Sequence, residues 1–156
     1  MIYVFDTNSL SVLRNYYPAT FPTLWGNIES ATGSGSIQSV HEVSAELELW
    51  NDAAFIETWA KQHKDIFAKP SDAELLAVQK ILAFPHFQSL ISQQALLKGK
   101  PVADPFVVAA AMVKGGTVVT EEQLKPNAAK IPNVCDHFRV PFIDLEGFLK
   151  HQGWTF

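Results

Sequence analysis

Short apolar runs alternate with amphipathic stretches along most of this 156-residue chain. The runs at 2–5, 36–40, 117–120 and 140–143 are rich in β-branched and aromatic residues, and each is predicted to form a buried strand. Strands that alternate with helices predict a parallel sheet that is covered on both faces. We therefore expect an α/β fold, a three-layer α/β/α sandwich with a central parallel sheet, in one domain that spans residues 1–156.

The segments between these runs share apolar residues at spacings of three and four, which predicts helices. They are a first helix capped by Asn8 or Ser9 and reaching Tyr17, a helix through Val43, Leu47 and Trp50, a largely helical region over 53–97, an apolar helix over 105–113, and a closing helix from Asp144. Ser71 and Glu74 are expected to form a capping box that starts a helix inside the central region. Gly115 and Gly116 are expected to end the apolar helix.

Acidic residues follow two of the expected strands. Asp6 ends the first strand, and Glu122 lies just beyond the third. Ligands of open parallel sheets bind beyond the carboxyl ends of the strands, where the strand order reverses, so we expect a site there. Glu46 and Asp104, at or near helix starts, are two further candidates. Each acid also has an ordinary explanation as a helix cap, a solvated helix residue or a solvated loop residue, and the residues alone leave both interpretations open.

Composition narrows the classes of function. The net charge of −4 and the pI near 5.7 argue against a protein that coats nucleic acid through a broad basic face. They are compatible with a nuclease whose bound cations neutralise its own carboxylates. Cys135 is the single cysteine, and the five histidines do not fall at HxxxH spacing, which argues against a disulfide and a zinc site. The chain starts without a basic leader and contains no long apolar run, so we expect a cytoplasmic protein with no membrane segment.

Five segments carry a resemblance to a known family. They are Ile-Tyr-Val-Phe-Asp-Thr-Asn-Ser at 2–9, Val-Ser-Ala-Glu-Leu at 43–47, Pro-Val-Ala-Asp-Pro-Phe-Val-Val-Ala-Ala-Ala at 101–111, Thr-Val-Val-Thr-Glu-Glu at 117–122, and Lys-Ile-Pro-Asn-Val-Cys-Asp-His-Phe at 130–138, which leads into Val-Pro-Phe-Ile-Asp-Leu. In this order they resemble the PIN-domain ribonucleases, specifically the DUF4411 branch of PIN-like proteins. The resemblance covers nearly the whole chain.

The resemblance implies a site with Mg²⁺ or Mn²⁺ held by four carboxylates, which fall on Asp6, Glu46, Asp104 and Glu122. All-oxygen ligands are those that these cations prefer. PIN domains usually have Asp at the fourth place, so Glu122 is one methylene longer than the pattern. The residues expected to orient these acids or to contact the substrate are Thr7, Asn8, Glu42, Thr120 and Glu121.

The function implied by the resemblance is metal-dependent endoribonuclease activity on RNA, leaving 5′-phosphate and 3′-hydroxyl ends. It further implies the toxin of a toxin–antitoxin module, with an antitoxin protein as partner; whether the chain is a monomer or a homodimer stays open. One rival is a PIN-like module that does not cut and binds RNA or docks a partner. A second rival, a haloacid-dehalogenase-like phosphatase, needs an acid two residues after Asp6, where this chain has Asn8.

Overall fold

Four short parallel strands form one sheet in the part of the chain that the computed structural model describes, residues 1–49, 54–91, 97–99 and 102–156. The strands are β1 (Tyr3–Phe5), β2 (Ile37–Gln38), β3 (Thr117–Val119) and β4 (Phe142–Ile143), in the order β2-β1-β3-β4. Every pair is parallel, as predicted. Because β2 and β3 lie on opposite sides of β1, the chain direction across the sheet reverses at β1, beside the predicted site.

Helices connect the strands, and several of them begin where the sequence provides a side-chain cap or a proline. They are α1 (Thr7–Val12), α2 (Pro22–Gly33), α3 (His41–Glu48), α4 (Ala54–Gln62), α5 (Asp72–Leu82), α7 (Asp104–Lys114), α8 (Ile131–Phe138) and α9 (Leu145–Gln152), with 3-10 turns η1 (Leu13–Asn15), η2 (Lys64–Ile66) and η3 (Pro85–Leu90). As predicted, Ser71 caps α5 and the left-handed Gly115 ends α7. Within the described ranges, none of these helices is long and apolar enough to cross a membrane.

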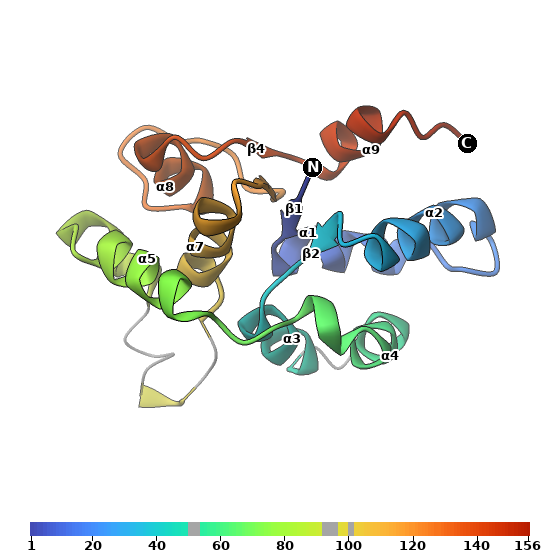
Figure 1. Ribbon diagram of the computed structural model, residues 1–156, viewed down its shortest axis with the longest axis horizontal. Helices are drawn as coiled ribbons and strands as arrows, with labels where there is room; N and C mark the ends of the chain where they lie inside the picture. Colours follow the sequence, from blue (N-terminus) through green and yellow to red (C-terminus); the bar gives the residue numbers. More distant parts are fainter. Residues whose placement is uncertain (50–53, 92–96, 100–101) are drawn as a thin grey trace.

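The helices form layers on both faces of the sheet, which confirms the predicted α/β/α architecture. The rings of Tyr3 and Phe5 each pack edge to face on Phe148 of α9, with centroids 5.0 Å apart. Val4 points to the opposite face because side chains alternate along a strand. Helix α7, whose residues Val107 to Ala111 are buried, contacts β1 and β3. Figure 1 places α5 and α7 on one side of β1 and α2 and α9 on the other.

The first helix differs from its prediction. It starts at Thr7 and is capped by Asp6, not by Asn8 or Ser9, because the Asp6 carboxylate accepts the backbone N–H of Ser9. It does not reach Tyr17, which precedes a proline and is 61% exposed. An aromatic residue at helical spacing from Leu10 and Leu13 is therefore not part of the buried stripe.

Other boundaries also moved. Strand β2 is shorter than predicted because the backbone N–H of Ser39 bonds to the carbonyl of Ile66 and not to β1. Helix α8 was not predicted as a helix, although Pro132 near its start suits a first turn. The predicted helical region over 53–97 is divided into α4, η2, α5 and η3. Trp50, and the part of that region at 92–96, lie outside the described residues.

Candidate active site

Asp6 is at the centre of the candidate site. It follows β1 directly, caps α1, and is only 2% exposed. Its Oδ1 accepts the backbone N–H of Ser9 at 2.8 Å, and its Oδ2 accepts the hydroxyl of Thr120 at 2.6 Å. Burial raises the pKa of Asp6 to about 6, although these hydrogen bonds lower it. Capping and a position at the carboxyl end of the sheet therefore coexist in one residue.

Thr120 joins the end of β3 to Asp6. Its hydroxyl donates to the Asp6 carboxylate and accepts the backbone N–H of Glu122 at 3.1 Å. The carboxylate of Glu122 accepts the backbone N–H of Ile131, at the start of α8, at 3.0 Å. Glu122 is close enough to Asp6 for its negative charge to contribute to the raised pKa of that carboxyl. The chain segments after β1 and β3 are thus brought together as the parallel sheet predicted.

Glu46 approaches from α3, a separate part of the chain. The hydroxyl of Thr7 donates to its Oε2, and the backbone N–H of Ala103 donates to its Oε1 at 3.2 Å. Burial raises the pKa of Glu46, whereas the hydrogen bonds from Thr7 and Ala103 lower it. These bonds fix the Glu46 carboxylate between α1 and the start of α7.

Asp104 is the first residue of α7, one residue after Ala103. The interpretation of Asp104 as a helix cap is wrong: Ala103 occupies the cap position, and no side chain caps α7. Burial and the charges of Glu122, Glu46 and Asp6 together raise the pKa of Asp104 to about 7, and burial is the largest of these effects. Asp104 is therefore the carboxyl whose pKa is raised by the charges of all three other acids.

Three of the other predicted residues occupy different surroundings. Glu121 turns away, and its carboxylate accepts the backbone N–H of Leu145 at the start of α9 at 2.8 Å. The side chain of Asn8 is exposed. Glu42, expected to orient the acids or to contact the substrate, has a buried Oε2 with no hydrogen-bond partner among the described residues. Burial raises the pKa of Glu42, and the nearby charge of Glu74 on α5 raises it as well.

The donor set fits a hard divalent cation. In the described part of the chain, no Lys, Arg or His forms an ion pair with Asp6, Glu46, Asp104 or Glu122. A cation would relieve the repulsion that raises the pKa of Asp104. Over the same ranges, no group of three or more His, Cys, Asp or Glu side chains is already arranged to hold a metal ion, and protein donors bond to three of the four carboxylates. A hydrogen-bonded carboxylate oxygen keeps further acceptor capacity, so these bonds do not prevent ligation.

The sequence analysis missed several contributors. Ser9 secures the site twice, through its N–H to Asp6 and through its hydroxyl to the Val119 carbonyl at 2.9 Å. The thiol of Cys135 is buried, and burial, with the charges of Asp6 and Glu122, raises its pKa to about 12. The cap bond uses the backbone N–H of Ser9, which any residue except proline would supply, so the serine itself is no cap signal. Nothing in the sequence locates Cys135 beside the acids.

Comparisons with known proteins agree with this architecture. A family model described as "Domain of unknown function (DUF4411)" matches residues 3–156. The crystal structure of VapBC2 from Rickettsia felis, bound to a DNA fragment from their promoter, contains a chain similar to this one with a TM-score of 0.50 and 16% identity. The match covers 92% of this chain and 98% of that chain. No curated protein matches. Since the family model spans nearly the whole sequence, the chain belongs to the DUF4411 family, and its fold is PIN-like.

Proposed function

We propose that the chain is a Mg²⁺- or Mn²⁺-dependent endoribonuclease that hydrolyses RNA phosphodiester bonds. The observation that carries this proposal is the arrangement beyond the ends of β1 and β3. There Thr120 bonds to Asp6 and to the backbone of Glu122, and Glu46 bonds to the backbone of Ala103 beside Asp104. The charges of Glu122, Glu46 and Asp6 add to burial in raising the pKa of Asp104 to about 7. Perturbed carboxylates gathered at the switch point of a parallel sheet are typical of catalytic sites. The order of the motifs, which resembles that of PIN-domain ribonucleases, supports RNA as the substrate.

Asp6, Glu46, Asp104 and Glu122 would hold the cation. When bound, it would supply Lewis-acid charge at the scissile phosphate. Asp6 and Glu46 are preorganised, since each carboxylate receives two hydrogen bonds from the protein. Asp104 has no cap bond to break and is the acid that gains most from the arrival of positive charge.

We further propose that the chain is the toxin of a toxin–antitoxin module with an antitoxin protein as its partner. The family resemblance supports this role. The solved structure of similar fold is described as VapBC2 bound to DNA from their promoter, which is consistent with a gene pair that regulates itself. Expression of the chain alone is expected to slow bacterial growth, and coexpression of a small protein from the neighbouring gene is expected to reverse this.

The direct test is cleavage of single-stranded RNA by the purified chain. We expect cleavage with Mn²⁺ or Mg²⁺, no cleavage with EDTA, and products with 5′-phosphate ends. Asp104→Asn, which removes no helix cap, should abolish cleavage, and Asp136→Asn on the exposed face of α8 is the matched control. Cleavage that survives both EDTA and Asp104→Asn would exclude this mechanism. RNA binding without cleavage under every metal condition would favour the binding module.

A further inference from the structure

A cavity of about 430 Å³ lies between α3, α4 and the segment 64–69. Its apolar floor is formed by the buried residues Leu47, Ala60 and Phe67. Ser44 and Glu48 also line the cavity, and at about 100° per residue both lie about 160° around α3 from Glu46. The cavity is therefore separate from the candidate active site.

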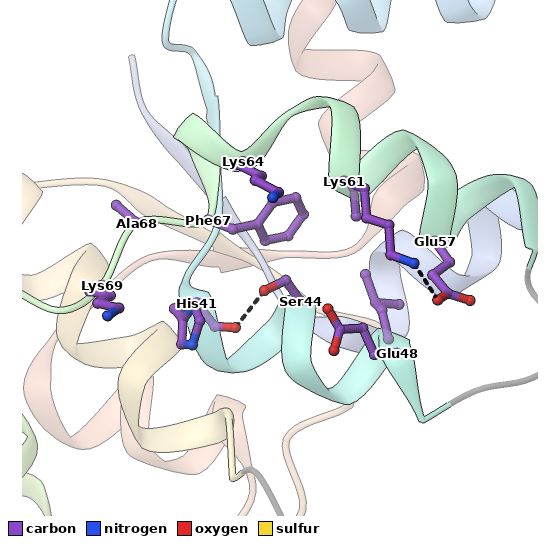
Figure 2. A pocket seen from close by; sticks show the side chains of 11 residues that line it. His41, Ser44, Glu48, Glu57, Lys61, Lys64, Phe67, Ala68 and Lys69 are labelled. Carbon is purple, nitrogen blue, oxygen red and sulfur yellow. Dashed lines mark hydrogen bonds and ion pairs between the residues drawn. The ribbon is translucent and has the colours of Figure 1, made fainter.

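The charged groups around this cavity are divided between its two ends. Figure 2 shows Lys69 and His41 at one end and Glu48 and Glu57 at the other, with Lys64 above the ring of Phe67 between them. The cavity thus offers positive charge at one end and hydrogen-bond acceptors at the other.

The lysines differ in their partners. Lys61, which lies at the acidic end, is neutralised there, since its Nζ is 3.0 Å from Oε1 of Glu57. Neither Lys64 nor Lys69 forms an ion pair with any residue in the described ranges. These two ammonium groups, which no carboxylate in the described ranges pairs with, are the groups at this cavity that would attract an anion.

We infer that this cavity binds a phosphorylated nucleotide. The phosphate would lie between Lys64, Lys69 and His41, where the unpaired positive charge is. Lysine is a common phosphate ligand that acts as a point charge. The base and ribose would cover the apolar floor, and their amino and hydroxyl groups would donate to Glu48 and Glu57. The volume suits a small ligand of this size, because ligand pockets start at about 300 Å³.

The two acids at the rim favour a nucleotide over an acidic peptide. A nucleotide presents an anion at one end and hydrogen-bond donors at the other, as the cavity requires. An acidic peptide presents carboxylates along its length, and Glu48 and Glu57 would repel them. The nucleotide can be free or part of an RNA strand, since both offer the same chemistry. This inference does not depend on RNA cleavage by the acids on the opposite face of α3.

The test is calorimetric titration of the full chain in EDTA, so that no divalent cation contributes at the acidic site. The ligands are 5′-AMP, adenosine and hexaglutamate. The variant Lys64→Gln/Lys69→Gln should bind 5′-AMP about tenfold more weakly, since each exposed charge contact contributes modestly. Lys64→Arg/Lys69→Arg should retain binding. The control Lys80→Gln/Lys150→Gln changes two lysines on other helices and should leave the affinity unchanged.

The proposal is overturned if 5′-AMP does not bind, if adenosine or hexaglutamate binds as tightly as 5′-AMP, or if the Gln variant retains full affinity. A short single-stranded RNA then identifies the source of the nucleotide. Tighter binding of RNA than of 5′-AMP, lost in the Gln variant, assigns the cavity to an RNA strand; equal or weaker binding assigns it to a free nucleotide. Because the titration contains EDTA, its outcome does not depend on RNA cleavage, and the nuclease proposal is tested separately with Mn²⁺ or Mg²⁺ present.

Discussion

Neutralising Asp104 should stabilise the metal-free protein at neutral and alkaline pH while abolishing its proposed activity. Asp104 is half-buried, and its partial burial with the charges of Glu122, Glu46 and Asp6 raises its pKa from 3.8 to about 7. Asp104 makes no capping bond that Asn would have to replace. The variant Asp104→Asn therefore removes an unfavourable charge at little structural cost.

The sign of the pH dependence follows from the direction of the shift. Between pH 3.8 and about 7 the folded state holds a proton on Asp104 that the unfolded state has released. The free energy of unfolding therefore falls as the pH rises through this window and stays low above it. The change in the pKa of Asp104 from 3.8 to about 7 corresponds to at most about 4 kcal/mol. Relaxation and solvent screening lower the gain in the free energy of unfolding that we expect from Asp104→Asn to about 1–2 kcal/mol.

The measurement is urea unfolding in EDTA at pH 3.5, 5 and 8. Asp104→Asn should match the wild type at the lowest pH and exceed its stability at pH 8, while the control Asp136→Asn should follow the wild type throughout. Saturating Mg²⁺ should stabilise the wild type and reduce the difference, because a ligand that binds only the folded state adds to its stability. A variant that is less stable than the wild type at pH 8 would refute the repulsion on which the site is argued.

The remaining predictions concern single side chains. Glu46→Gln should abolish RNA cleavage and leave the fold intact. Glu42→Gln should reduce cleavage much less, because Thr7 and Ala103 donate hydrogen bonds to Glu46 and not to Glu42. Loss of cleavage in the Glu42 variant would contradict this. Removing the Thr120 hydroxyl with Val should lower cleavage by about 10- to 100-fold without unfolding the protein, as is usual for groups that orient metal ligands. Burial lowers the pKa of His63, but its bonds to the Trp59 carbonyl and the Glu29 carboxylate outweigh this and raise it, so stability should be lost as the pH rises above about 6.5. Urea unfolding of His63→Gln should lack that loss.

The fold and the ends of the central strands were accessible from sequence. Continuous apolar runs located β1 and β3, and the polar residue that stops each run marked the carboxyl edge of the sheet. These are local signals, since a buried parallel strand must be apolar on both faces. The position of Glu122 relative to Asp6 then followed from the parallel register of the two strands.

The details that sequence missed depend on contacts between distant segments. Asp before Pro left a cap interpretation open for Asp104, yet the backbone N–H of the preceding Ala103 bonds to Glu46, 57 residues earlier. Glu121 and Glu122 are adjacent, and only the packed positions of α8 and α9 decide which helix start each carboxylate reaches. The unpaired Oε2 of Glu42 is likewise a tertiary feature, because it depends on burial and on the nearby charge of Glu74 from a distant part of the chain.

The candidate site is destabilising by itself, and the surrounding donors show how the fold tolerates it. Burial of Asp6 raises its pKa, and the N–H of Ser9 and the hydroxyl of Thr120 offset part of that cost. Burial also raises the pKa of Glu46, and the hydrogen bonds from Thr7 and Ala103 offset part of that effect. No side-chain cap bond offers Asp104 comparable relief, so the unfavourable free energy of the cluster is concentrated on that carboxyl. Because buried acids are retained only where something offsets their cost, a cation at Asp104 would convert the largest local penalty into binding free energy.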